Sequence, residues 1–175
     1  MSRFGWSDRI VAAVHILLLT TLMAMPAGAA GQTAGRPWGF WATAGLGPAT
    51  PYEVGIAASA VVRHNRILVR VRYASAGELL GNQDQDVGVL VGVVLTPVRS
   101  RGQLAVGAGV GRMSGSRGCV FCGSRPIPSA TGFLLDMEGR FALTGFLGLT
   151  GYAFADLNSR ETFGGIAFGL YLGTR

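Results

Sequence analysis

Residues 66–73 read Arg-Ile-Leu-Val-Arg-Val-Arg-Tyr, so charged and apolar side chains alternate along this stretch. Neighbouring side chains of a β-strand point to opposite faces, which places Arg66, Arg70 and Arg72 together on one face. A soluble β-sandwich or barrel would bury the apolar face and expose the arginines to water. A transmembrane β-barrel does the reverse, with its apolar face toward lipid and its charged face toward the lumen.

Residues 1–29 have the pattern of a secretory signal peptide. Arg3 and Arg9 form a short basic start, residues 10–25 are apolar, and the small residues Pro-Ala-Gly-Ala of positions 26–29 fit a cleavage site. The alternative is a membrane anchor, but the apolar run is shorter than the roughly 20 residues that span a bilayer. We therefore expect one domain, residues 30–175, outside the cytoplasm.

The formal net charge is +6, and all 15 basic residues are arginine. Nucleic-acid-binding proteins gather such charge on one face or along one helix. Here the arginines are spread along the chain, so we expect no nucleic-acid partner.

Short alternating segments closed by turn residues recur along the domain, and this pattern predicts β-strands. Many of the 28 glycines lie inside apolar segments, where they would weaken a helix. We predict eight strands, at residues 38–46, 53–63, 66–74, 86–95, 103–113, 131–142, 145–156 and 163–173.

The connections between these segments alternate between short and long. The short ones are residues 64–65, 96–102 and 143–144; the longer ones are residues 47–52, 75–85, 114–130 and 157–162. A transmembrane barrel with both chain ends in the periplasm has short periplasmic turns and longer outer loops in this order. A Greek-key sandwich has no reason to keep such an alternation.

One face of most segments is bulky and apolar, and the other is small or charged. In residues 131–142, for example, Asp136, Glu138 and Arg140 lie opposite large apolar side chains. A narrow eight-stranded barrel has room inside mainly for small residues and a few paired charges. Residues 145–156 stay ambiguous, because Tyr152 and Phe154 share a face with polar residues.

The chain resembles the small OmpA/OmpX-type outer-membrane β-barrel proteins in its signal peptide, its eight alternating segments and its alternating loop lengths. Residues 165–170, Gly-Ile-Ala-Phe-Gly-Leu, also resemble the assembly signal of such barrels, although residues 173–175 replace the family's terminal aromatic residue. The resemblance implies an all-β, eight-stranded antiparallel up-and-down transmembrane β-barrel in the bacterial outer membrane. It also implies contact with outer-membrane lipid and with the barrel-assembly machinery.

Within such a barrel the charged residues would face the same lumen. Unpaired charges in a narrow interior cost several kcal/mol each, so carboxylates and guanidinium groups there should pair. The hypothesis is an ion-paired plug that closes the lumen; a channel would instead use the same residues as a selectivity filter. The alternative is that some of the arginines lie at the rims in water. The candidate cluster comprises Arg66, Arg70, Arg72, Asp136, Glu138 and Arg140.

Cys119 and Cys122 form a C-x-x-C pair in a long connection. Such a pair can be a redox site or half of a zinc site. His64 is the one histidine after the signal peptide and lies in a turn at the opposite end, so we expect neither a metal nor another cofactor. A small structural disulfide in an oxidising compartment is the favoured interpretation.

The search for catalytic residues is negative, because His64 has no evident partner and arginines would keep Asp136 and Glu138 ionised. We therefore expect a non-enzymatic barrel with a structural or surface-interaction role. The alternatives are a small outer-membrane channel and a soluble periplasmic ligand-binding barrel of the lipocalin type. Arg112, Arg117 and Arg125, around the third long connection, could contact anionic lipopolysaccharide; the favoured alternative is that these loop arginines are simply solvated.

Overall fold

The computed structural model describes residues 37–78, 82–96, 101–119 and 123–174. The expected signal peptide, residues 1–29, lies outside the described residues. No helix in the described part of the chain is long and apolar enough to cross a membrane. The strands are β1 (Trp38–Gly47), β2 (Ala49–Thr50), β3 (Val54–His64), β4 (Ile67–Gly77), β5 (Gln83–Val94), β6 (Gly102–Cys119), β7 (Gly123–Ala142), β8 (Leu147–Asn158) and β9 (Phe163–Gly173).

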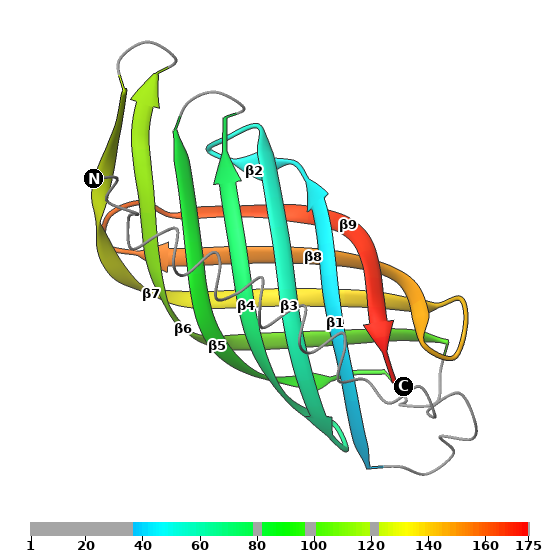
Figure 1. Ribbon diagram of the computed structural model, residues 1–175. Coiled ribbons are helices and arrows are strands. Elements are labelled where there is room, and N and C mark those ends of the chain that lie inside the picture. The colour runs from blue at the N-terminus through cyan, green and yellow to red at the C-terminus, as the bar shows by residue number, and fades with distance from the viewer. Residues whose placement is uncertain (1–36, 79–81, 97–100, 120–122, 175) are drawn as a thin grey trace, which may run out of the picture. The chain divides into compact units, whose positions relative to one another are not determined.

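The strands form one closed antiparallel barrel (Figure 1). Each long strand pairs with the next in the chain, and β1 pairs with β9 to close the sheet. The two-residue strand β2, which the sequence did not predict, adds to the end of β9. Among the described residues there are thus eight barrel strands, and the predicted fold class is confirmed.

The first tight turn lies one residue later than predicted. Its two residues are Asn65 and Arg66, and Asn65 adopts a positive φ of 56°. Asparagine tolerates this left-handed conformation better than most residues, so it takes the first turn position. Arg66 therefore belongs to the turn and not to β4.

The third long connection is shorter than predicted. Residues 114–130 read as a loop because they are rich in glycine, serine and proline, but β6 continues to Cys119 and β7 begins at Gly123. The pairing shifts register between Met113 and Gly115, which marks a β-bulge. The described part of β7 before Gly132 pairs with β6 alone, so this hairpin stands beyond β8 (Figure 1).

Large apolar side chains cover the outside of the barrel. Val110 is 62 % exposed and Phe168 is 66 % exposed, whereas five charged residues of β4 and β7 are buried inside: Arg70, Arg72, Asp136, Glu138 and Arg140. Exposed aromatic side chains gather near the rim that carries the short turns; they are Trp38, Phe40, Phe141 and Phe146. This is the reverse of the polarity of a soluble barrel.

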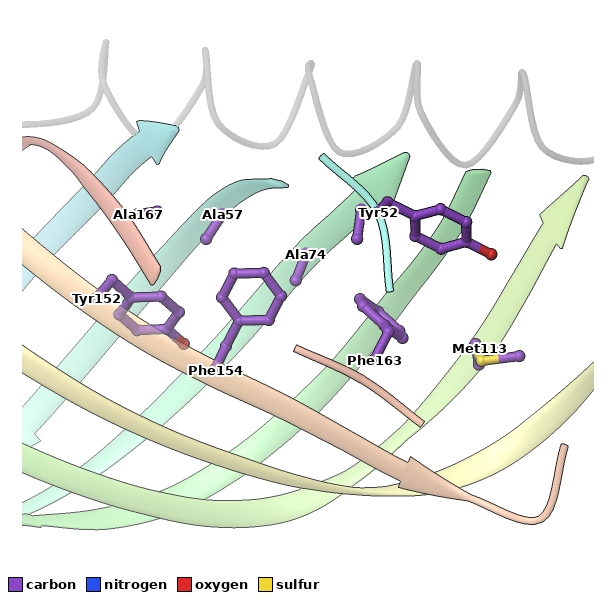
Figure 2. Packing of buried hydrophobic residues seen from close by; sticks show 9 residues of the cluster. Tyr52, Ala57, Ala74, Met113, Tyr152, Phe154, Phe163 and Ala167 are labelled. Atoms are coloured by element: carbon purple, nitrogen blue, oxygen red, sulfur yellow. The ribbon is translucent and has the colours of Figure 1, made fainter. Parts of the chain in front are cut away.

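The ambiguous strand β8 turns its aromatic side chains inward. Tyr152 and Phe154 are buried and pack with Phe163, while Tyr52 and Met113 lie further along the same interior cluster (Figure 2). The expectation of an interior filled mainly by small residues therefore holds for only part of the wall. Glycines on β5 and β6 leave space for large groups from other strands: a Cβ on Gly111 would lie 2.7 Å from Leu134 Cδ1, and one on Gly107 would lie 2.7 Å from Asp136 Oδ1.

Candidate functional site

The centre of the lumen holds one arginine between two carboxylates. Arg70 reaches from β4 across to β7, where its Nη1 lies 2.6 Å from Asp136 Oδ2 and its Nη2 pairs with Glu138. All three side chains are fully buried. The contact to Asp136 is an ion pair whose geometry departs from that of a hydrogen bond. We call these three residues the central cluster.

Aromatic side chains complete the central cluster. Tyr152 donates its hydroxyl proton to Asp136 Oδ2 at 2.6 Å, and its ring lies 5.1 Å from Arg70 Cζ. Trp41 donates from Nε1 to Glu138 Oε2 at 3.3 Å. Each carboxylate thus has both a cation and a neutral donor, as a buried charge requires.

Arg72 pairs with a carboxylate that the sequence analysis did not assign. Its Nε and Nη2 donate to the two oxygens of Asp86 on the neighbouring strand, at 3.1 and 2.6 Å. Its Nη1 donates to the carbonyl of Leu135 at 3.0 Å. Asp86 lies on β5, the strand next to that of Arg72, and is within reach of its side chain. Asp136 and Glu138 already pair with Arg70.

Two buried arginines lie near the rim of the short turns, on the same side of the barrel wall as Trp41. Arg140 places its Cζ 3.5 Å from the centre of the Trp41 ring and donates to Gln103. Arg63, from β3, donates from Nη1 to the carbonyl of Asn65 at 2.8 Å. Neither arginine makes an ion pair with a described carboxylate. Sequence reasoning predicted Arg140 in the lumen and missed Arg63. The signal for Arg63 was its position two residues after Val61, which puts both side chains on the buried face of β3.

The placement of Arg66 in the lumen is wrong. The side chain is exposed and lies in the turn with Asn65. A strict alternation over residues 66–73 would have put Arg66 on the inner face. The strand begins only at Ile67, so Arg66 belongs to the turn. Arg66 thus fits the alternative in which some of the arginines lie at the rims in water.

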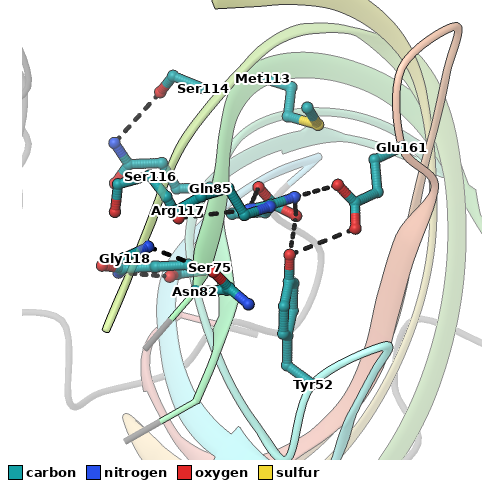
Figure 3. Close-up of polar contacts among 12 residues, drawn as sticks. Tyr52, Ser75, Asn82, Gln85, Met113, Ser114, Ser116, Arg117, Gly118 and Glu161 are labelled. Carbon is teal, nitrogen blue, oxygen red and sulfur yellow. Dashed lines mark hydrogen bonds and ion pairs between the residues drawn. The ribbon is translucent and has the colours of Figure 1, made fainter. Parts of the chain in front are cut away.

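At the opposite end of the lumen, four residues form what we call the outer clamp (Figure 3). Arg117 contacts both oxygens of Asp84, at 2.8 and 3.1 Å, and also pairs with Glu161. Tyr52 donates to Asp84 Oδ2 at 2.6 Å and lies 3.3 Å from Glu161 Oε1. Each residue lies in or beside a different long connection, so the clamp ties all four outer connections together.

The contacts in the clamp set the protonation states of Tyr52 and Arg117. Burial, and after it the hydrogen bond to Asp84, raises the pKa of Tyr52 above its ordinary value. The hydrogen bond to Asp84 raises the pKa of Arg117. Tyr52 therefore stays a neutral donor and Arg117 stays a cation across the physiological range.

Sequence reasoning missed most of the outer clamp because Tyr52, Asp84 and Glu161 fell in segments predicted as loops. One signal was present: residues 83–86 read Gln-Asp-Gln-Asp, which continues the alternation of β5 and puts Asp84 on the same face as Asp86. Of the loop arginines, Arg117 turns inward to the clamp. Arg112 is exposed and donates to Ser129 Oγ at 2.6 Å.

The predicted Cys119–Cys122 disulfide lies outside the described residues, since Cys122 and the side chain of Cys119 are not among them. Within the described ranges, no group of three or more histidine, cysteine, aspartate or glutamate side chains is placed to hold a metal ion.

Solved structures share this architecture. Neisserial surface protein A is 13 % identical over 77 % of this chain and 94 % of its own, with a TM-score of 0.58. The N-terminal β-barrel domain of Pseudomonas aeruginosa OprF is 7 % identical over 79 % and 98 %, with a TM-score of 0.62. Ail, the attachment invasion locus protein of Yersinia pestis, was solved with the heparin analogue sucrose octasulfate; it is 14 % identical over 78 % and 95 %, with a TM-score of 0.50.

No protein-family model matches the sequence, and no curated protein matches it either. The structural neighbours are bacterial outer-membrane barrels. Their likeness, at 7–14 % identity, confirms the expected class at the level of the fold: this chain has the fold of the small eight-stranded outer-membrane β-barrels.

Proposed function

We propose that the chain spans the bacterial outer membrane as a non-enzymatic barrel with a closed lumen and a structural or surface-interaction role. The observation that carries this proposal is the reversed polarity of the wall. Large apolar side chains face outward, while the fully buried side chains of the interior include arginine and glutamate. Monomeric soluble proteins rarely expose a continuous apolar surface of this kind.

The height of the apolar surface fits a membrane. On β7 it runs from Phe133 to Phe141, about 26 Å along the strand at about 3.3 Å per residue, or about 20 Å across a bilayer for a tilt of about 40°. Above it, polar side chains join across the outer face of the barrel: Tyr73 donates to Gln85, and Gln85 to Ser114. These contacts mark the outer boundary of the band, as the exposed aromatic residues mark the inner one.

Two layers of ion pairs support a closed lumen. The central cluster crosses the lumen from β4 to β7, and the outer clamp joins the four outer connections. A conducting pore would have to break at least the buried contacts of Arg70, which leaves charges without partners. Arg70 holds Asp136 and Glu138 in fully buried ion pairs, so neither carboxylate is open to a substrate, which supports a non-enzymatic role.

The membrane location is tested by fractionation and by gel electrophoresis with and without boiling. We expect the protein in the outer-membrane fraction, with a folded band that shifts on boiling. A freely soluble periplasmic protein would contradict the proposal and favour the lipocalin-type barrel.

The closed lumen is tested by conductance in planar bilayers. We expect no steady single-channel steps from the purified protein. Steady steps would contradict the plug and favour the small channel, in which the buried arginines would select ions. A variant with Arg70→Ala and Arg117→Ala, which removes a cation from each layer, is expected to conduct more than a variant with Arg66→Ala and Arg160→Ala, in which both cations are exposed.

Exposed arginines beyond the apolar band support contact with the anionic phosphates of lipopolysaccharide. Arg112, Arg125 and Arg160 are exposed and lie toward the end of the barrel that carries the long connections. Replacing Arg125 and Arg160 by glutamine is expected to weaken binding to lipopolysaccharide micelles. The matched control replaces Arg66 and Arg101, both exposed at the opposite rim, by glutamine; equal weakening by both variants would contradict a specific contact.

A further inference from the structure

Some donors of the buried guanidinium groups near the short turns have no acceptor. Among the described residues, Nε and Nη2 of Arg63 have no hydrogen-bond partner, and the same is true of Nε of Arg140. Arg63 is 1 % exposed and Arg140 is 6 % exposed, so water at the surface does not compensate. Buried donors are almost always satisfied in native proteins, and an unsatisfied one points to a water or an ion that completes it.

The free donors of Arg63 form one edge of its guanidinium. Nε–H and Nη2–H lie side by side and make the fork that binds a carboxylate or phosphate through two oxygens. This edge faces Gly39 on β1: a Cβ built there would lie 2.9 Å from Nη2 and 3.0 Å from Nε. The fork therefore rests against the Cα of Gly39, and neither of its donors has an acceptor among the described residues.

Among the described residues, no carboxylate forms an ion pair with the two buried arginines at this end. Arg63 and Arg140 both lie near Trp41. Arg140 covers the Trp41 ring. Arg63 lies on the inner face of β3, two residues after Val61, and Val61 is the cross-strand partner of Trp41. Arg66 and Arg101 add exposed positive charge at the same rim. A mouth lined by one sign of charge concentrates counter-ions of the other sign.

We propose that the short-turn end of the lumen is a binding site for a small oxyanion of the phosphate type, held by the Nε/Nη2 fork of Arg63 with Arg140 as the second cation. The anion enters from the rim, and the guanidinium of Arg63 turns away from Gly39 to meet it while Nη1 keeps its contact with Asn65. This site is separate from the central cluster and from the outer clamp, whose arginines are already paired.

The test measures urea unfolding of the folded protein in detergent micelles, by tryptophan fluorescence, while sodium phosphate replaces sodium chloride at constant ionic strength. A ligand that binds only the folded state raises the unfolding midpoint in a saturable way. We expect this for the unmodified protein. We expect Arg63→Gln to weaken the apparent phosphate affinity at least tenfold, and Glu53→Gln, at an exposed position at the other end, to leave it unchanged.

Two further measurements keep the test decisive if Arg63→Gln does not fold. Arg63→Lys keeps the charge and loses the fork, so its phosphate affinity should fall between those of the unmodified protein and the glutamine variant. The ³¹P signal of inorganic phosphate should broaden on addition of the unmodified protein. The proposal is overturned if phosphate and chloride act alike on the unmodified protein, which would leave water as the missing acceptor, or if Arg63→Gln responds to phosphate as the unmodified protein does.

Discussion

The two ends of the lumen hold their arginines in different ways. At the outer end Arg117 lies between Asp84 and Glu161 and closes a set of ion pairs. At the short-turn end Arg140 lies over the ring of Trp41, and no carboxylate of the described residues pairs with it or with Arg63. Stacking on an aromatic face compensates part of the lost hydration of a guanidinium, but it leaves the charge in place.

This difference separates two functions of buried charge. The outer clamp satisfies its own members, so it serves to hold connections together. At the short-turn end some buried donors have no acceptor in the described part of the chain, so this end is the part suited to a ligand. The central cluster has both ion pairs and an aromatic contact, since Arg70 pairs with Asp136 and Glu138 and also lies over the ring of Tyr152.

The largest expected effect is at the central cluster. Arg70→Met leaves Asp136 and Glu138 buried without their cation, which should lower the free energy of unfolding by about 3–5 kcal/mol. Urea unfolding in micelles measures it. Arg66→Met is the matched control on the adjoining turn, where an exposed side chain should change stability by less than about 0.5 kcal/mol. Equal losses in the two variants would contradict the ion-paired plug.

The two ends should respond differently to loss of a cation. Arg117→Met strands the buried Asp84, and we expect a loss of about 2–3 kcal/mol, less than for Arg70 because the Arg117 side chain is 32 % exposed. Arg140→Met removes a cation with no described ion pair and keeps the apolar contact with Trp41, so stability should change by less than about 1 kcal/mol. The comparison fails if the order of these two losses, measured by the same unfolding assay, is reversed.

The clamp should also weaken at alkaline pH. Tyr52→Phe removes the hydroxyl that donates to Asp84, and we expect a loss of about 1–2 kcal/mol at neutral pH. Because the folded state raises the pKa of Tyr52, its contribution is present below the ordinary tyrosine pKa of about 10 and is lost as the pH rises above it. The difference between the two proteins should therefore shrink above pH of about 10. A difference independent of pH would contradict the assigned hydrogen bond.

The smallest effect is expected at Gly39. A Cβ there meets only the end of the Arg63 side chain, which can move, so Gly39→Ala should cost less than about 1 kcal/mol. At the outer end Gly132→Ala should cost more, about 1–3 kcal/mol, because its Cβ would lie 2.0 Å from Oδ1 of the shorter Asp156 side chain. The Gly39→Ala cost should vanish in an Arg63→Met background; if it persists, the two residues are not coupled.

The sequence predicted the barrel and the direction of most side chains, because alternation is a local property that each strand carries on its own. It also placed Arg70, Asp136 and Glu138 in one lumen. It could not predict that Arg72 pairs with Asp86, because that choice depends on the register between strands and on which carboxylates Arg70 already occupies.

The remaining differences have local causes. Arg66 left the lumen because Asn65 accepts the left-handed turn conformation. Most of the outer clamp was missed because Tyr52, Asp84 and Glu161 fell in segments predicted as loops. The ends of β6 and β7, which are rich in glycine, serine and proline, also have the composition of a loop. There, pairing with a neighbouring strand overrides weak local preference.

The long β6–β7 hairpin has a consequence for how copies of the protein can coexist at high density. The part of β7 before Gly132 has a described partner on one side, so its other edge resembles a template on which a further strand could grow. Pro126 and Pro128 lie in this part and provide no N–H for such growth. The hairpin can therefore extend from a crowded surface without joining its neighbours into a continuous sheet.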